Sequence, residues 1–331
     1  MSHPSLQAQQ MSYFGKLPMR GDFVKGIYNP QLLRVLDNWL SQGMELLSED
    51  PRWKLIYDDA APLHFVCLGS RSRLAIAGHV RPSHDESSRR YPFLAAVPLD
   101  VERATDFMSG APALLQPWWD TVSRRVADLE TSRDIEADLR SLEAVPCHVE
   151  TIFKGSSAQA AYQNFIRDYS LLRIEQTLNS DGHKVSLRRL TLALGLLLQP
   201  VMASTVSHLE KGLTLPLPRD PFLQPLLATF WLDIVSRFFA RADFELVLCV
   251  SAVSGLPRLI VGFNGLSPRT LQSVLHLQVH AEQNIEIDNP EWVEESIHSN
   301  YAMYKLVSYL EQPQLPLEIV LSAFREVFIG D

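Results

Sequence analysis

The sequence contains very little cysteine. Its 331 residues include three cysteines, which lie far apart at positions 67, 147 and 249. Such a sparse and odd set fits a reducing compartment and excludes both a disulfide framework and a cysteine-rich zinc site. The first residues, MSHPSLQAQQMS, lack the basic and apolar regions of an export signal. We therefore expect a cytoplasmic protein.

Long apolar runs are also absent. The longest, residues 190–204, is interrupted by Pro200, and it is shorter than the roughly 20 residues that a membrane-spanning helix needs. The sequence thus predicts no membrane insertion. We expect this run to form a buried helix that ends or kinks at Pro200.

Positive charge is not in excess. The chain has 30 Lys and Arg against 38 Asp and Glu, a net charge of −8. This balance argues against nucleic-acid binding, because neutralising phosphates requires clustered cations. Residues 281–331 hold ten acidic and two basic side chains, so their balance of −8 equals that of the whole chain. This acidic end is either a solvated helical face or a docking surface for a basic partner.

The acidic end also has helical periodicity. We expect its apolar residues to pack on residues 220–280, namely Trp292, Val293, Ile297, Tyr301, Tyr304, Leu306 and Leu310. Five acids should then point outward: Glu286, Asp288, Glu291, Glu294 and Glu295.

The apolar pattern of the first half predicts a small α/β domain over residues 12–150. Residues 30–49 have the three- and four-residue spacing of an amphipathic helix, and residues 113–144 are helical again. Short apolar runs bounded by turn residues predict three strands, at residues 62–69, 73–80 and 91–99. The connection between the first two suits a hairpin.

The second half predicts a helix-rich C-terminal domain over residues 151–331. We expect a helix over residues 156–178 that is capped by Ser156. Further helices are expected at residues 220–241 and 267–279 and in the acidic end. Two strands near residues 244–263 should form a hairpin. The fold class expected is therefore α/β of the α+β kind, an antiparallel sheet flanked by helices with a helix-rich second half.

Catalytic motifs are missing. The sequence has no phosphate-binding P-loop, no Gly-x-Ser-x-Gly, no Gly-x-Gly-x-x-Gly and no His-Glu-x-x-His. The densest polar stretch, GHVRPSHDESSRRYPF, carries metal-ligating residue types at His79, His84, Asp85 and Glu86. Their spacing matches no closed ligand set. We predict no metal, no cofactor and no enzyme, with a metal-dependent hydrolase built on His79, His84 and Asp85 as an alternative.

Two stretches, YFGKLPMRGDFV and AIAGHVRPSHDESSRRYPFLAAVPL, occur in that order with LDNWLSQGM and DPRWKLIYDDAAPLHFVC between them. Together they resemble the TagF (ImpM) family of type VI secretion-associated proteins, over about residues 12–100 and less clearly to 150. The first box is matched by Gly15, Lys16, Leu17, Pro18, Arg20, Gly21, Asp22 and Phe23. The second box is matched by Gly78, Pro82, Ser83, Asp85, Arg89, Tyr91 and Pro92.

The resemblance implies a cytoplasmic, non-catalytic regulator. Proteins of this family repress type VI secretion after translation by binding a forkhead-associated (Fha) scaffold protein of the same apparatus. The resemblance also implies a longin- or roadblock-like fold for the first domain. A structural or assembly component of the secretion machine is the alternative function.

The tripeptide Arg20-Gly21-Asp22 is not expected to be an adhesion loop, because a cytoplasmic protein meets no extracellular receptor. We expect Gly21 to permit a backbone conformation that a side chain would resist. The candidate site consists of the charged residues of the two boxes: Lys16, Arg20, Asp22, Asp85, Arg89 and Arg90. We expect the two loops to face each other through Arg20–Asp85 or Asp22–Arg89 pairs. Such a patch is either a structural clasp or a partner-facing surface.

Overall fold

The computed structural model of the chain describes residues 10–69, 71–146, 153–203, 209–239, 244–297 and 301–330. Cys147 and the domain boundary expected near residue 150 lie outside these ranges.

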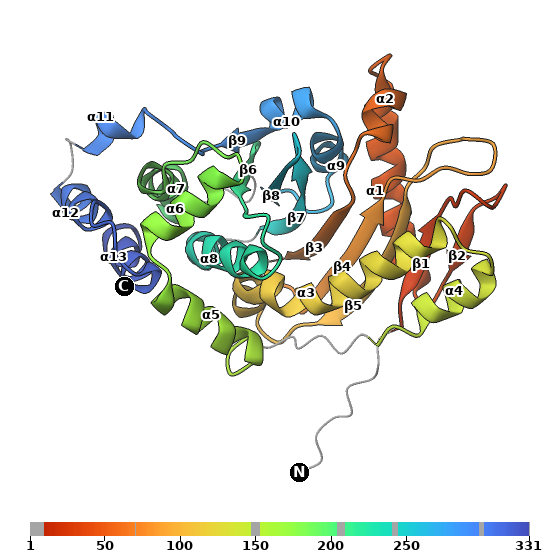
Figure 1. Cartoon of the computed structure of the whole chain (residues 1–331), viewed down its shortest axis with the longest axis horizontal. Coiled ribbons are helices and arrows are strands. Elements are labelled where there is room, and N and C mark those ends of the chain that lie inside the picture. The colour runs from red at the N-terminus through yellow and green to blue at the C-terminus, as the bar shows by residue number, and fades with distance from the viewer. Residues whose placement is uncertain are drawn as a thin grey trace, which may run out of the picture.

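The described chain is built around one nine-stranded sheet in the order β2-β1-β5-β4-β3-β7-β8-β6-β9 (Figure 1). Neighbouring strands are antiparallel except β6 and β9, which run parallel. The strands are β1 Ser12–Gly15, β2 Val24–Gly26, β3 Leu63–Gly69, β4 Leu74–Arg81, β5 Phe93–Asp100, β6 Gly212–Pro216, β7 Glu245–Val253, β8 Leu256–Gly262 and β9 Asn284–Glu286.

The predicted strands of the first half and the predicted hairpin of the second half are present as β3, β4, β5 and as β7–β8. Ser254 and Gly255 join β7 to β8 with positive φ at both positions, as a two-residue hairpin turn requires. β3 pairs with β7 along its length. One sheet therefore runs through both halves, and the division into two domains stays a prediction.

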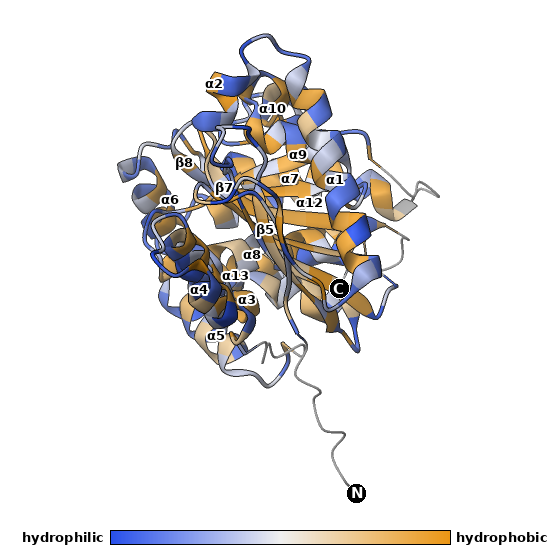
Figure 2. Cartoon of the chain, turned by 90° about the vertical axis from the view of Figure 1, so that its right-hand side faces the viewer, coloured by the Kyte–Doolittle hydropathy of each residue, from blue (hydrophilic) through white to orange (hydrophobic). Residues whose placement is uncertain are grey.

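Helices cover both faces of the sheet (Figure 1). On one face α1 (Pro30–Ser48) packs against α9 (Pro268–Leu275), and on the other α3 (Ala104–Leu129) packs against α8 (Leu223–Phe238). Figure 2 shows the apolar residues gathered on the sheet and on the helix sides that face it. Because each helix pair joins one helix from each half, the β3–β7 junction is covered on both sides.

The other helices extend these layers. They are α2 Trp53–Asp58, α4 Ile135–Glu143, α5 Ser157–Asp168, α6 Leu171–Ser180, α7 Leu187–Ala203, α10 Leu277–Gln283, α11 Val293–Ile297, α12 Tyr301–Leu310 and α13 Leu317–Phe328. None of the helices in the described ranges is long and apolar enough to cross a membrane.

Local sequence accounts for several helix starts. Asn29 accepts a hydrogen bond from the Leu32 amide at 2.9 Å and Pro30 occupies the first turn of α1, where its missing N–H costs nothing. Ser156 caps α5 as expected, accepting from the Gln159 amide at 3.0 Å. The apolar face that follows each cap is buried against the sheet or a neighbouring helix.

Several helix predictions differ from the structure, and the helix expected over residues 267–279 is two helices, α9 and α10, separated at His276. α3 begins at Ala104 and contains two prolines inside it, rather than beginning at residue 113. The helix expected over residues 156–178 is two helices, because the Ser170 side chain accepts from the Arg173 amide and starts α6. The helix expected over residues 190–204 is present as α7; of the two expectations for Pro200, an end of the helix there is wrong, because α7 contains Pro200 and continues to Ala203, and a kink stays a prediction.

The acidic end folds only partly as expected. Val293, Ile297, Leu306 and Leu310 are buried, whereas the expected burial of Trp292 and Tyr304 is wrong, since both side chains are exposed; the side chain of Tyr301 lies outside the description. α11 packs on α7 and α12, and α12 also packs on α13 and α7. Contact with α8 comes from α13, where Phe324 meets Phe238.

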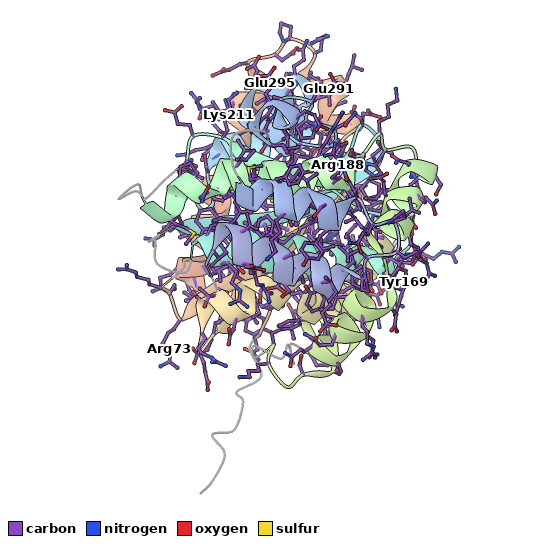
Figure 3. All side chains as sticks on the ribbon, turned by 90° about the vertical axis from the view of Figure 1, so that its left-hand side faces the viewer. Arg73, Tyr169, Arg188, Lys211, Glu291 and Glu295 are labelled. Carbon is purple, nitrogen blue, oxygen red and sulfur yellow. The ribbon has the colours of Figure 1, made fainter. Side chains whose placement is uncertain are left out.

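Four of the five acids expected outward have a charged or titratable partner within the chain. Asp288 accepts from the buried Arg258 at 2.7 Å, and Glu294 accepts from Arg188 and, at 2.8 Å, from Arg189. Glu286, Glu291 and Glu295 are exposed, although Glu286 lies 3.5 Å from His280 Nε2 and Glu291 lies 3.9 Å from Arg189 Nη1. Figure 3 shows Glu291 and Glu295 at one end of the molecule with Arg188 below them. Part of the negative charge of the acidic end therefore balances arginines of α7 and β8.

Candidate functional site: a clasp between two loops

Two loops carry the boxes of the sequence. The first loop, residues 16–23, follows β1, and the second loop, residues 82–92, joins β4 to β5. β1 and β5 are antiparallel neighbours, with Phe14 opposite Leu94. The end of β1 therefore lies beside the start of β5, and this register brings Lys16 next to the second loop.

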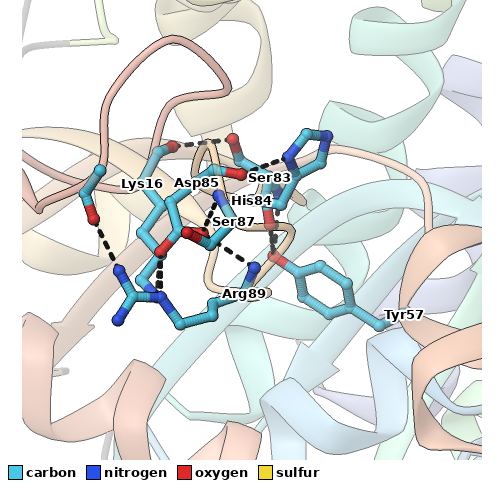
Figure 4. Close-up of polar contacts among 8 residues, drawn as sticks. Lys16, Tyr57, Ser83, His84, Asp85, Ser87 and Arg89 are labelled. Carbon is cyan, nitrogen blue, oxygen red and sulfur yellow. Dashed lines mark hydrogen bonds and ion pairs between the residues drawn. The ribbon is translucent and has the colours of Figure 1, made fainter.

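Asp85 is the centre of the contact between the loops (Figure 4). Its side chain is fully buried. One carboxylate oxygen, Oδ2, accepts from Lys16 Nζ at 2.9 Å and from Arg89 Nε at 2.6 Å. The other, Oδ1, accepts from the backbone amides of Ser87 and Arg89, both at 2.9 Å. The four donors compensate the loss of water around this carboxylate.

The protonation state of Asp85 follows from these contacts. Burial acts to raise the pKa of Asp85, but the hydrogen bonds from Lys16 and Arg89 outweigh it and hold that pKa well below its usual value. Asp85 is thus a carboxylate at neutral pH, and Lys16, whose side chain is only 10% exposed, is its counter-ion.

Further hydrogen bonds tie the loops together. Ser83 Oγ donates to the carbonyl of Lys16 at 2.7 Å, and Arg89 Nη2 donates to the carbonyl of Gly21 at 2.7 Å. Tyr57, from α2, donates to the Ser83 carbonyl and accepts from the Ser83 amide (Figure 4). We call Lys16, Ser83, Asp85 and Arg89 the loop clasp.

The remaining candidate residues lie outside the loop clasp. Arg20 pairs with Glu136 of α4, and Arg90 makes a two-pronged pair with Asp58 at 2.6–2.7 Å. Asp22 is exposed. The expected pairs Arg20–Asp85 and Asp22–Arg89 are wrong, because the β1–β5 register places Lys16, not Arg20, against Asp85.

The structure also corrects the glycine prediction. Gly21 has no positive φ, and a Cβ built there would meet only Glu86 Oε2, at 3.9 Å. Gly15 has φ +144°, and a Cβ there would lie 2.3 Å from the carbonyl oxygen of Pro92. The first box thus needs glycine at the end of β1, where the backbone touches the second box. Sequence reasoning also missed Tyr57, Asp58 and Glu136 as partners of the loops.

His79 does not join His84 and Asp85 in a metal site. It is buried, lies opposite His64 of β3 in the strand register, and its Nδ1 is 3.2 Å from His64 Nδ1. The His64 ring stacks on Trp119 of α3. Among the residues that the structure describes, no three His, Cys, Asp or Glu side chains are grouped to hold a metal ion.

The buried histidine pair should make stability depend on pH. Burial lowers the pKa of His64 to about 4 and holds the pKa of His79 well below its usual value. The unfolded chain, with histidine pKa values near ~6.5, binds these protons first as the pH falls. The contribution of the histidine pair to the free energy of unfolding should therefore be constant above about pH 6.5. It should be lost as the pH falls from there towards 4, and His64 should account for about 3 kcal/mol of the loss.

The measurement is urea unfolding between pH 7 and pH 4. His64→Phe keeps an aromatic ring against Trp119 and should flatten the pH dependence by the His64 share. His84→Gln, at an exposed position, is the control and should leave the dependence unchanged. An equal pH dependence in His64→Phe and the natural chain would contradict the assignment.

Comparisons with known proteins agree with the two boxes. Residues 12–145 match a family model described as the TagF N-terminal domain, type VI secretion system-associated. No curated protein sequence matches the chain. Among solved structures the chain is similar to PA0076 from Pseudomonas aeruginosa PAO1, with 25% identity and a TM-score of 0.37. That similarity covers 41% of this chain and 63% of PA0076, less than two thirds of its length. The family match includes both loops of the clasp and confirms the resemblance.

Proposed function

We propose that this chain, whose residues 12–145 match the TagF N-terminal domain of type VI secretion-associated proteins, is a cytoplasmic, non-catalytic repressor of type VI secretion. It acts after translation by stoichiometric binding of a forkhead-associated scaffold protein of the apparatus. The family match over residues 12–145, with both boxes inside it, is the observation that carries this proposal.

The contacts of the polar residues support a binding role over a catalytic one. The reactive groups of the second box are engaged: Asp85 holds four hydrogen bonds, and His79 is buried against His64. A hydrolase built on His79, His84 and Asp85 would need these groups free to meet a substrate or a metal. Metal analysis of the purified protein tests this step, because a stoichiometric ion would favour the hydrolase.

The candidate residues divide by exposure into two roles. Lys16 and Asp85 are buried and act as a structural clasp that fixes the two loops. Asp22 is exposed at the loop surface, and the partly exposed side chains of Arg20 and Arg89, which pair with Glu136 and Asp85, border it. Their outer sides would face a partner, where arginine is favoured at interface hot spots. In this proposal the buried residues of the clasp lie beneath the exposed residues that face a partner.

Deletion of the gene is the test of the proposed function. A repressor removed from the cell should leave type VI secretion intact or raise it, and returning the gene should restore repression. Abolished secretion would contradict the proposal and favour a structural component of the machine.

Purification of the tagged chain from native lysate, followed by mass spectrometry, should recover the forkhead-associated scaffold in a stoichiometric amount. Absence of that protein from the purified complex would overturn the partner assignment.

A further inference from the structure

The outermost strand on the N-terminal side of the sheet is β2. β1 alone pairs with it among the described strands, so the other edge of β2 has no strand beside it (Figure 1). A groove of about 440 Å³ lies between α1 and the face of the sheet that β2 and Phe14 of β1 present to it. An open strand edge beside a groove is the geometry in which proteins accept an additional strand.

The groove side of β2 alternates in chemistry. Phe23, Lys25 and Ile27 all line the groove, as residues two apart in an extended chain lie on the same face. Phe23 and Ile27 are 49% and 48% exposed, a large exposure for apolar side chains. Phe14, opposite Lys25 in the β1–β2 register, and Leu33 of α1 extend the apolar lining.

The charge in the groove is positive. Lys25 and Arg34 line it and make no ion pair with the described residues. Asp37 also lines the groove, where its carboxylate accepts a hydrogen bond from Tyr91 at 2.8 Å, so the groove has two cations and one acid. The order of groove-lining side chains over residues 23–27, which are β2 and its two neighbours, is therefore apolar, cationic, apolar, and α1 supplies a second cation and the acid.

A second copy of this chain is a poor occupant of the edge. In symmetric antiparallel pairing of two β2 strands about their central residue, Lys25 would lie opposite Lys25 of the copy. Like charges directly opposite each other destabilise a strand pair, and lysine on an edge strand is a common guard against self-association. The same lysine favours a strand with an acid at that position.

We propose that the β2 edge is a docking site for an extended segment of a partner protein, which adds a tenth strand to the sheet. The segment carries an acidic side chain opposite Lys25, near Arg34, and apolar side chains two residues before and after it, opposite Phe23 and Ile27. Backbone hydrogen bonds to β2 supply affinity, and the apolar–acidic–apolar pattern supplies specificity. This inference rests on the proposed function, because it names the surface by which the chain holds a partner.

Hydrogen exchange of the full chain tests the inference directly. The probe is an acetylated and amidated heptapeptide, Thr-Val-Thr-Glu-Thr-Val-Thr, at millimolar concentration. It should slow amide exchange in the fragment that contains residues 24–26, since strand addition protects the free edge amides. The matched peptide with Lys in place of Glu should bind about three- to fivefold more weakly, from the loss of a cross-strand ion pair.

Charge reversal of the protein supplies the control. Lys25→Glu should reverse the preference, so that the Lys peptide protects the edge better than the Glu peptide. Lys184→Glu makes the same charge change at an exposed site elsewhere and should leave the preference for the Glu peptide intact. No protection of residues 24–26 by the Glu peptide, or equal protection by both peptides, overturns the inference.

The outcome is separable from that of the proposed function. If the scaffold co-purifies with the natural chain and with Lys25→Glu equally, the scaffold uses another surface and the inference fails while the proposed function stands. If the peptides behave as expected and no forkhead-associated protein co-purifies, the edge is a docking site and the partner assignment fails.

Discussion

Replacing Asp85 with alanine should lower the midpoint of thermal unfolding by roughly 5–10 °C. The change leaves a buried lysine without its counter-ion and removes the hydrogen bonds that hold the two loops together. Lys16 would lose its counter-ion while its side chain stays 10% exposed. The amides of Ser87 and Arg89 would lose the Oδ1 acceptor that shapes the second loop. The measurement is differential scanning calorimetry at neutral pH, where Asp85 is ionised.

Asparagine at position 85 separates the two contributions. Asp85→Asn retains a carbonyl oxygen for the backbone amides but removes the charge that Lys16 and Arg89 meet, so its unfolding midpoint should fall between those of the natural chain and Asp85→Ala. Asp22→Asn is the matched control in the first loop, since Asp22 is exposed, and it should change the midpoint little. If Asp85→Ala lowered the unfolding midpoint no more than Asp22→Asn does, the loop clasp would not stabilise the fold.

The strands of the fold could be predicted where each is a long apolar run. β3, β4, β5 and the β7–β8 hairpin have seven to nine residues each, and local pattern is enough to identify them. β6 has five residues and ends in proline, and β9 is Asn-Ile-Glu. Those two become strands through pairing with distant partners, which no local window of sequence contains.

The candidate site shows the same limit. The boxes identified Lys16, Asp85 and Arg89 as members of one polar patch, because their charges stand among turn residues. They did not identify which charge meets Asp85. That choice depends on the register of β1 against β5, and the burial of Lys16 and Asp85 follows from it. Tertiary pairing therefore decides which motif residues are inside and which remain at the surface.

Gly15→Ala should destabilise the chain by about 4 kcal/mol, combining the strain of an L side chain at this backbone conformation with a steric clash. The φ of Gly15 is +144°. A Cβ at this position would lie 2.3 Å from the carbonyl oxygen of Pro92 and 2.5 Å from the Cα of Phe93. Backbone atoms of a paired strand cannot move away as a flexible side chain can. The free energy of unfolding in urea measures the effect.

Gly21→Ala is the control, because it makes the same chemical change in the first loop, six residues after Gly15. Gly21 lacks the positive φ of Gly15, and the atom nearest to its Cβ would be the end of the Glu86 side chain at 3.9 Å. Alanine there should leave stability within about 0.5 kcal/mol or raise it slightly, since it restricts the unfolded chain. The contrast tests the arrangement of the two boxes: if Gly21→Ala were the more damaging change, the first loop would need its freedom at the tripeptide. The close approach of β1 to Pro92 would then not be what requires glycine in the first box.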